Sequence, residues 1–353
     1  MSRPASSAKM GMPPGLTRRG FLAAVGTGLV TTTGVWAAAP DPLALVDPEL
    51  RAAARTLPVI TVDATTLPAR RAIPDLPPLP PPAPQPQFHT IPGGKGAPDV
   101  RVMIIDGSAV QSGKPAYLHM HGGGFVAGRL AQNPAIQQRL AQDAACLIVS
   151  VDYRLAPETR FPGALDDNYA ALRWLHEQAD ALGVDRTRIA VGGDSAGGGH
   201  AAMLAIAARD RGEYPIAFQL LVYPMLDDRT ASTVSVPPHI GTMGWTRESN
   251  RFGWASLLGQ APGLATVPAG SVPARVDNLA GLPPTFIAVG GLDLFVGEDM
   301  AYAQRLNAAG VPVELLLVPG AFHGFQNVVP DARISRQFKA AIASALRRGL
   351  ARA

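Results

Sequence analysis

A serine flanked by glycines stands between a predicted strand and a predicted helix. The run Gly193-Asp194-Ser195-Ala196-Gly197 follows the apolar strand Arg188-Ile189-Ala190-Val191 and opens an alanine-rich helical stretch. Small neighbours permit the sharp turn that leaves a serine hydroxyl exposed at the end of a strand. The hydroxyl would stand above a helix N-terminus, whose dipole favours negative charge. The pattern predicts Ser195 as the nucleophile of an acyl-transfer reaction.

A glycine-rich loop precedes this serine along the chain. It reads His121-Gly122-Gly123-Gly124-Phe125 and follows the apolar strand that ends at Met120. Glycines let a backbone turn its N–H groups toward a developing oxyanion. With the N–H of Ala196 the loop would supply three donors, and losing one such donor costs about 10²–10³ in rate. We interpret His121 as a residue that buttresses the loop and not as the catalytic base.

A serine nucleophile needs a base, and the base needs an acid that orients it. We predict His323 as the base, because it lies in Gly320–Phe325, just past the apolar run Val313–Val318. His200 is expected to pack behind the serine turn, and His119 and His176 are expected to be structural. The seven histidines that compete for the role are His89, His119, His121, His176, His200, His239 and His323.

The orienting acid should stand at the end of the strand that precedes the base. The run Thr285–Val289 ends in Gly290-Gly291-Leu292-Asp293, which predicts Asp293 as this acid. Glu298 and Asp299 are rivals, but both fall in the first turn of the next helix, where acids also act as caps.

Strands and helices alternate along the part of the chain that must position these residues. Such alternation predicts an α/β fold with a mostly parallel sheet and helices on both faces. Val100–Ile105 alternates like a half-buried strand. The other predicted strands are Ala116–Met120, Cys146–Val151, Ile189–Gly192, Phe218–Tyr223, Thr285–Val289 and Val313–Val318, and the predicted helices are Asn133–Asp143, Ala164–Leu182, Ala196–Arg209, Glu298–Ala309 and Ala332–Arg348.

Three segments fall outside this alternation. Residues 41–58 read as one short helix, and residues 74–86 are dominated by proline and predict a stiff, extended spacer. Residues 226–280 predict an insertion over the carboxyl ends of the strands, where ligands bind in such sheets. We hypothesise that the insertion and its start contribute an apolar acyl pocket, although plain core packing is the alternative for its members Met225, Met243, Trp245, Phe252 and Trp254.

Charge and cysteine content narrow the function classes. Of the 31 basic residues four precede Asp41, and 27 remain to balance the 27 acidic residues. The body of the protein is therefore close to neutral, and a nucleic-acid-binding surface is unsupported. The single cysteine, Cys146, excludes a disulfide within the chain and is interpreted as a buried core residue.

The N-terminus predicts an export signal. Arg18 and Arg19 precede a weakly apolar run from Phe21 to Ala39, in the manner of a twin-arginine signal, although Ala23 stands where a basic residue is usual. An ordinary secretion signal and a disordered arm are the alternatives, and an uncleaved anchor is the alternative to cleavage. We predict a signal peptide at residues 1–37, cleavage after Ala37, no stable membrane span after cleavage, and a periplasmic or secreted enzyme.

Together these motifs resemble the hormone-sensitive-lipase-like carboxylesterases, the bacterial type IV family. The resemblance spans roughly residues 45–350. It is carried by His121–Phe125 (HGGGF), Asp152–Glu158 (DYRLAPE), Phe161-Pro162 with Asp166-Asp167, Gly193–Gly198 (GDSAGG) and Phe322–Phe325 (FHGF).

The resemblance implies an α/β-hydrolase fold with a helical cap. It implies a cap segment and spacer at residues 38–87, and a catalytic domain at 88–353 with a cap insertion at about 226–280. It assigns Ser195, Asp293 and His323 as the triad and places the oxyanion donors at Gly123, Gly124 and Ala196. Supporting positions are His121, Gly122, Asp194 and Glu298, whereas Tyr153, Arg154 and Glu158 are structural.

The implied activity is hydrolysis of short- to medium-chain acyl esters through an acyl-enzyme, with no cofactor and no metal. A deacetylase or amidase that uses the same triad, or a non-catalytic receptor of the same fold, are the alternatives. The partner is then a small-molecule ester, and a homodimer is compatible with the sequence.

One motif departs from the family pattern. The family's D-P-L-x-D-E reads Asp293-Leu294-Phe295-Val296-Gly297-Glu298 in this chain. Without the proline and the second aspartate, we expect a weaker turn that still retains Asp293 and Glu298.

Overall fold

A computed structural model describes residues 41–351 of the protein. The signal peptide predicted for residues 1–37, and the first residues of the predicted cap segment, lie outside this range.

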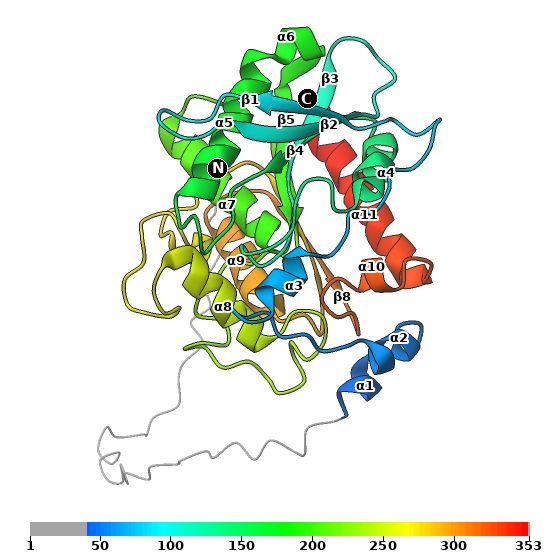
Figure 1. Cartoon of the computed structure of the whole chain (residues 1–353), viewed down its shortest axis with the longest axis vertical. Coiled ribbons are helices and arrows are strands. Elements are labelled where there is room, and N and C mark those ends of the chain that lie inside the picture. Colours follow the sequence, from blue (N-terminus) through cyan, green and yellow to red (C-terminus); the bar gives the residue numbers. More distant parts are fainter. Residues whose placement is uncertain (1–40, 352–353) are drawn as a thin grey trace, which may run out of the picture. The chain divides into compact units, whose positions relative to one another are not determined.

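An eight-stranded sheet forms the centre of the described part of the chain (Figure 1). Its strand order is β1-β2-β4-β3-β5-β6-β7-β8, and all pairs from β4 to β8 are parallel, whereas β1-β2 and β2-β4 are antiparallel. The predicted fold class is confirmed. The strands are β1 Gln87–Ile91, β2 Val100–Asp106, β3 Lys114–Met120, β4 Leu147–Asp152, β5 Val184–Asp194, β6 Phe218–Val222, β7 Thr285–Gly290 and β8 Val313–Val318.

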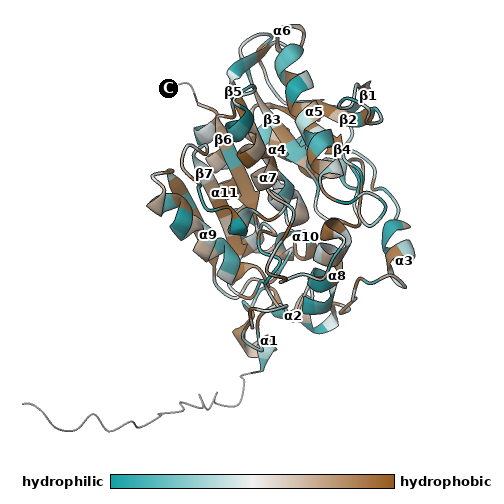
Figure 2. Ribbon diagram, turned by 90° about the vertical axis from the view of Figure 1, so that its left-hand side faces the viewer, coloured by the Kyte–Doolittle hydropathy of each residue, from teal (hydrophilic) through white to brown (hydrophobic). Residues whose placement is uncertain are grey.

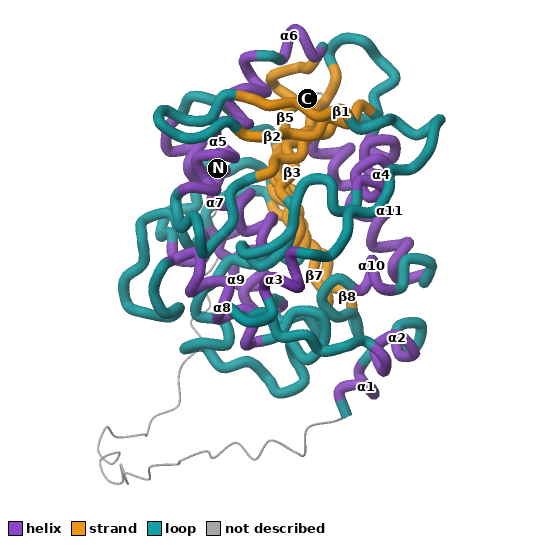
Figure 3. Tube along the Cα trace, viewed as in Figure 1, coloured by secondary structure: helices purple, strands orange, loops and turns teal. Residues whose placement is uncertain are grey.

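Helices cover both faces of the sheet (Figure 3), with α4 and α11 on one side and α5, α7 and α9 on the other. The helix predicted at Ala164–Leu182 is divided at Gln178 into two helices. The helices are α1 Pro42–Leu45, α2 Arg51–Thr56, α3 Leu67–Arg71, α4 Pro134–Ala144, α5 Gly163–Glu177, α6 Ala179–Leu182, α7 Ala196–Arg211, α8 Arg247–Leu258, α9 Val296–Ala308, α10 Phe325–Val328 and α11 Arg333–Gly349, with a 3-10 turn at Pro273–Arg275.

Two apolar clusters, one on each face, hold the layers together. Successive strand residues point to opposite faces, so Leu118 packs toward the α5–α7 side and Tyr117 toward the α4–α11 side. The central strands are accordingly brown over much of their length in Figure 2, with teal at a few polar positions, whereas α5 and α9 alternate apolar and polar residues. The half-buried pattern predicted for β2 was wrong: only Arg101 and Asp106 are exposed, because helices cover both sides of this strand as well.

The N-terminal segment differs from the single helix predicted for residues 41–58. It forms α1 and α2, separated by a turn at residues 46–50, and the unpredicted helix α3 follows. The N–H of Asp47 donates to the carbonyl of Gly320 at 3.0 Å, and Val46 and Leu50 are buried. The turn between the two helices therefore docks on the loop that precedes His323.

The proline-rich stretch is attached to the body rather than free. Residues 74–86 form no helix or strand, as the prolines predict. The buried Gln138 of α4 accepts the N–H of Leu79 at 2.6 Å and donates to the carbonyls of Leu79 and Pro84 at 3.1 and 2.9 Å. One glutamine thus fixes the spacer against α4.

Neither a membrane-spanning helix nor a metal-binding cluster is found among residues 41–351. No helix there has the length and apolarity needed to cross a bilayer, and no three histidine, cysteine or acidic side chains are grouped to hold a metal ion.

Candidate active site

Ser195 stands in a strained turn between β5 and α7. Its backbone has φ 58° and ψ −122°, a conformation that only close surroundings sustain in a non-glycine residue. A Cβ on Gly193 or Gly197 would lie 2.2 or 2.1 Å from the carbonyl oxygen of Met120, so both positions require glycine. The N–H of Ser195 donates to the carbonyl of Val222 at 2.9 Å, which anchors the turn to β6.

The structure brings the three predicted catalytic side chains together. His323 Nε2 lies 3.1 Å from Ser195 Oγ, and His323 Nδ1 lies 2.8 Å from Asp293 Oδ2. Asp293 is fully buried at the end of β7, and His323 lies in the loop after β8. With its Nδ1 proton held by the carboxylate, the imidazole presents the Nε2 lone pair to the hydroxyl.

Two aromatic rings restrict the imidazole. The ring centroid of Tyr223 lies 4.6 Å from that of His323, and Phe295 packs edge-on at 5.4 Å. Tyr223 in turn accepts a hydrogen bond from Gln326 Nε2, on the helix just after the histidine. These contacts limit rotation of the His323 ring, so its two nitrogens keep their partners.

The turn that carries Asp293 closes without the family's proline. The N–H of Asp293 donates to Gly290, the N–H of Val296 donates to Asp293, and the N–H of Phe295 donates to Asp293 Oδ1 at 3.0 Å. The expectation of a weakened turn is therefore not met in its hydrogen bonds, because backbone and side-chain bonds close it.

The loop predicted to bind the oxyanion has the conformations that its glycines allow. Gly123 has φ 133° and Gly124 has φ 63°. A Cβ at Gly123 would lie 1.9 Å from the carbonyl of Ala127, and one at Gly124 would lie 2.1 Å from the ring of Trp245. Within residues 41–351 the N–H groups of Gly123, Gly124 and Ala196 donate to no acceptor of the protein, which leaves them free to bind a ligand oxygen.

His121 stabilises this loop through contacts of its ring and its carbonyl. Its ring stacks on Tyr153 at 4.2 Å, its Nδ1 lies 2.9 Å from the carbonyl of Gly122, and the Tyr153 hydroxyl donates to its carbonyl at 2.6 Å. Burial lowers the pKa of His121 to about 4, against the weaker effect of the Gly122 carbonyl. His121 is therefore neutral near pH 7 and makes no bond to Ser195, in line with the buttressing role predicted for it.

Gly122 and Asp194, the other two supporting positions predicted near the nucleophile, lie next to each other. A Cβ on Gly122 would lie 2.6 Å from Asp194 Oδ2, so the glycine makes room for this carboxylate. The side chain of Asp194 is 42% exposed, and its Oδ1 lies 3.6 Å from His119 Nε2.

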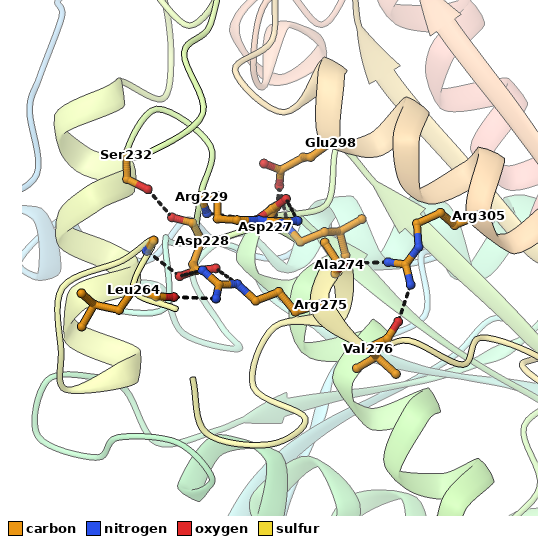
Figure 4. Close-up of polar contacts among 12 residues, drawn as sticks. Asp227, Asp228, Arg229, Ser232, Leu264, Ala274, Arg275, Val276, Glu298 and Arg305 are labelled. Atoms are coloured by element: carbon orange, nitrogen blue, oxygen red, sulfur yellow. Dashed lines mark hydrogen bonds and ion pairs between the residues drawn. The ribbon is translucent and has the colours of Figure 1, made fainter. Parts of the chain in front are cut away.

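Glu298 anchors the start of the 226–280 insertion (Figure 4) and does not contact His323. Its Oε1 accepts the N–H groups of Leu226 and Asp227 at 2.6 and 3.2 Å. Burial raises the pKa of Glu298 well above its usual value. In the same region Arg275 pairs with the fully buried Asp228 at 2.7 Å, and Arg305 donates to the carbonyls of Ala274 and Val276.

The rival histidines have other surroundings. His200 is buried behind the serine turn, edge-on to Phe125 and Tyr153 at 4.9 and 4.6 Å, as predicted, and burial lowers its pKa to about 3. His176 Nε2 lies 3.1 Å from the carbonyl of Pro215. His119 is buried and both of its ring nitrogens have partners, Ser150 at 3.1 Å and Gln137 at 3.2 Å, in line with the structural role expected of it, although it also lines the same cavity as Ser195.

The buried His200 makes stability depend on pH. In the unfolded chain this histidine takes up a proton below its ordinary pKa of 6.5, whereas the folded protein resists protonation down to about 3. The free energy of unfolding should therefore fall as pH decreases from 6.5 toward 3, with a slope of up to about 1.4 kcal/mol per pH unit from this group.

Replacing His200 with phenylalanine keeps the ring and removes the titrating nitrogens. Urea unfolding of His200→Phe between pH 7 and 4 should show a shallower loss of stability than the wild type. Parallel curves for the two proteins would show that His200 is not buried as a neutral ring.

A cavity of about 670 Å³ opens onto Ser195, His323 and the glycine loop. Of the five residues of the hypothesised acyl pocket, only Trp245 lines it. The hypothesis was wrong for Met225, Met243 and Trp254, which are buried in the core, and Phe252 packs against that core.

Another part of the cavity lining comes from the N-terminal segment, which the resemblance predicts as a cap segment and spacer but from which no site residue is predicted. Leu57, Ile60, Val62, Ile73 and Leu76 line it, and Ile60, Ile73 and Leu76 remain exposed. In the sequence, the available signal for this part of the site was a set of apolar side chains in a short, proline-flanked segment. In the structure several of them are exposed, and exposed apolar groups often mark a ligand site.

The cavity wall is tied to the glycine loop by two arginines. Arg71 of α3 pairs with Glu158 through its two terminal nitrogens, Nη1 and Nη2, at 2.7 and 2.8 Å. Its Nε donates to the carbonyl of Val126 at 2.8 Å. Arg129 pairs with Asp75 at 2.5 Å. Glu158 is thus structural, as implied, and it holds the segment that walls the cavity.

The chain is similar in sequence to known esterases. A sequence model of the family described as "alpha/beta hydrolase fold" matches residues 117–327. The chain is 42% identical to esterase LipI of Mycobacterium tuberculosis over 227 residues, which is 63% of this chain and 70% of the relative. It is 39% identical to carboxylesterase NlhH of the same species over 248 residues, 68% of this chain and 76% of the relative.

Solved structures of esterases are similar to this chain over a larger share of its length. A structure titled "Bacterial Heroin Esterase" has a TM-score of 0.80 at 39% identity and covers 88% of this chain and 100% of that one. Esterase LipW from Mycobacterium marinum has a TM-score of 0.75 at 34% identity, with 88% and 98% covered.

Proposed function

The chain belongs to the α/β-hydrolase-fold family whose sequence model it matches, and on that premise we propose that it is a serine carboxylester hydrolase with Ser195, His323 and Asp293 as its triad. The single observation that carries the proposal is the pair of hydrogen-bond distances at His323, 3.1 Å to the serine hydroxyl and 2.8 Å to the buried carboxylate. Named relatives that are esterases support the reaction class.

The proposed mechanism has two acyl-transfer steps. Ser195 Oγ attacks the ester carbonyl carbon while His323 Nε2 takes the hydroxyl proton, and the carbonyl oxygen becomes an oxyanion. The N–H groups of Gly123, Gly124 and Ala196 stabilise that oxyanion. The imidazolium, held by Asp293, gives its proton to the departing alkoxide, and the alcohol leaves an acyl-serine.

Water completes the cycle. His323 takes a proton from a water molecule, whose oxygen attacks the acyl carbon, and the same proton returns to Ser195 Oγ as the carboxylic acid is released. Asp293 stays ionised throughout, since its task is to orient the ring and to stabilise the imidazolium.

A substrate panel tests the reaction class. Purified enzyme should hydrolyse p-nitrophenyl esters and be covalently labelled by a serine-directed phosphonate. The matching anilides and acetylated sugars separate an esterase from an amidase or a deacetylase. Absence of both hydrolysis and labelling would favour a non-catalytic receptor of the same fold and would overturn the proposal.

The size and lining of the cavity support short- to medium-chain acyl groups as substrates. Trp245 is the member of the hypothesised pocket that lines the cavity. Trp245→Leu should therefore change the preferred acyl length, and we expect the ratio of kcat/KM between octanoate and acetate esters to change by about tenfold. Trp254→Phe is the matched control, because Trp254 is fully buried away from the cavity. An equal effect of both variants on all chain lengths would contradict this assignment of the wall.

Export through the twin-arginine route remains our proposal for the N-terminus, supported by Arg18, Arg19 and the apolar run that follows. Replacing both arginines with lysine should retain the protein in the cytoplasm, as cell fractionation would measure. Export at the wild-type level would instead favour an ordinary secretion signal.

A homodimer also stays a prediction, which light scattering on the purified protein would check.

A further inference from the structure

Helix α8 of the 226–280 insertion lies directly against the glycine loop. A Cβ on Gly253 would lie 2.5 Å from the carbonyl oxygen of Gly124, closer than a methyl carbon and an oxygen can approach. Gly253 lies inside α8 and is buried, and its backbone conformation is one that any residue can adopt. Because alanine is more favourable than glycine inside a helix, helix propensity does not explain this glycine. The close approach of the two backbones does.

The insertion contacts Gly124 at a second point. A Cβ on Gly124 would lie 2.1 Å from the ring of Trp245, so the ring fills the space beside the α-carbon of Gly124. Trp245 directly precedes Thr246, the N-cap residue of α8. The insertion therefore contacts Gly124 both at its α-carbon and at its carbonyl oxygen.

The next residue of the loop also depends on α8. Phe125 has φ 68°, a conformation that a bulky residue adopts only when its surroundings enforce it. Its buried ring lies edge-on to that of Trp254 of α8, with the ring centroids 4.8 Å apart. The carbonyl of Phe125 accepts the N–H of Ala156 at 3.0 Å. Two successive residues of the loop are thus packed against one helix.

Buried hydrogen bonds fix α8 in its own place. The side chain of Thr246 accepts the N–H of Ser249 at 3.1 Å, and the hydroxyl of Ser249 accepts the N–H of Val62 at 2.8 Å. The amide of Asn250 donates to the carbonyl of Thr230 at 2.9 Å. The helix is therefore tied to the N-terminal segment and to the rest of the insertion, which makes it a firm support for the loop.

We propose that α8 positions the glycine loop for catalysis, with Gly253 as a positioning residue that acts through the carbonyl of Gly124. This inference rests on the proposed esterase function, in which the N–H of Gly124 binds the oxyanion. The oxyanion exists in the transition state and not in the bound ester. A displaced donor should therefore lower kcat and leave KM nearly unchanged.

Gly253→Ala tests the close approach. The added methyl group must push α8 and Gly124 apart, and we expect kcat on p-nitrophenyl butyrate to fall by about 10- to 100-fold, because losing one donor outright costs about 10²–10³. KM should change by less than about threefold. The matched control is Gly297→Ala in α9, where a Cβ would meet no atom within 4 Å. Its kcat should stay within about twofold of the wild type.

A tetrahedral adduct gives a readout that is specific to the oxyanion. When Ser195 Oγ adds to the carbonyl carbon of a trifluoromethyl ketone, the serine proton passes to His323 and the ketone oxygen becomes an oxyanion. The inhibition constant of the ketone should rise in Gly253→Ala by about the factor by which kcat/KM falls, and Gly297→Ala should keep the wild-type value. A folded Gly253→Ala protein with wild-type kcat and inhibition constant would overturn the proposal.

Thr246→Ala decides the question if Gly253→Ala does not fold. This change removes the N-cap bond to Ser249, which loosens the start of α8 and leaves the contact at Gly253 unaltered. It should lower kcat and weaken ketone binding by about threefold or more at unchanged KM. Wild-type values of both would overturn the proposal. A wild-type enzyme that neither hydrolyses esters nor binds the ketone would refute the esterase function itself, and this inference with it.

Discussion

Replacing Ser195 with alanine is expected to lower kcat for ester hydrolysis by about 10⁴- to 10⁶-fold, with the fold retained. In the proposed mechanism the hydroxyl oxygen forms the acyl-enzyme, and it lies 3.1 Å from His323 Nε2. Alanine keeps the Cβ that the strained backbone at φ 58° already accommodates. Initial rates on p-nitrophenyl butyrate, with circular dichroism and a thermal midpoint for both proteins, measure the effect.

Phosphonate labelling provides the control for this variant. The wild type should gain one covalent adduct by mass spectrometry, and Ser195→Ala should gain none. Residual activity above about one percent, in protein free of wild-type contamination, would mean that another group attacks the ester. An adduct on the variant would mean the same.

Replacing Asp293 with asparagine is expected to lower kcat by about 10³- to 10⁴-fold. The buried carboxylate accepts the Nδ1 proton of His323 at 2.8 Å, and an amide at this position can donate to Nδ1 and so stabilise the wrong tautomer. The proton then sits on Nε2, which no longer accepts the serine hydroxyl proton. The kcat of the variant, measured across pH on a soluble ester, gives the size of the loss.

Glu298→Gln is the matched control for the orienting acid. Glu298 is the rival carboxyl in the same segment, and it accepts the N–H groups of Leu226 and Asp227, which a glutamine oxygen can also accept. We expect its kcat to fall less than tenfold. A larger loss from Glu298→Gln than from Asp293→Asn would reverse the two roles.

The convergence of Ser195, His323 and Asp293 could be predicted because their environments are local. Gly193 and Gly197 are required because a neighbouring stretch of backbone lies too close to the serine turn to admit a Cβ at either position. Glycine at these two positions therefore indicates the turn. Likewise, a short apolar run followed by an isolated Asp293 or His323 places each side chain at one edge of a parallel sheet. Strand order then brings the three ends together.

The walls of the cavity could not be predicted in the same way. Met225, Met243 and Trp254 looked like pocket residues by type and position, yet they face the core. Ile60 and Leu76 line the cavity, and they come from a segment predicted only in outline, as a cap segment and spacer. Which face an apolar side chain presents depends on the helices and loops that pack on it, and those are distant in the sequence. Arg71, which ties the N-terminal segment to the glycine loop through Val126, has no sequence signature for that task.

By itself, therefore, the sequence determined the fold class, the turn that carries Ser195 and the histidine and aspartate that meet it, because backbone sterics and strand order specify these features locally. Only the tertiary structure decided which residues of the N-terminal segment line the cavity, that His119 lines it as well, and that a motif without its proline still closes the Asp293 turn. These depend on packing between segments far apart in the chain, where many side chains of the same type compete for each contact.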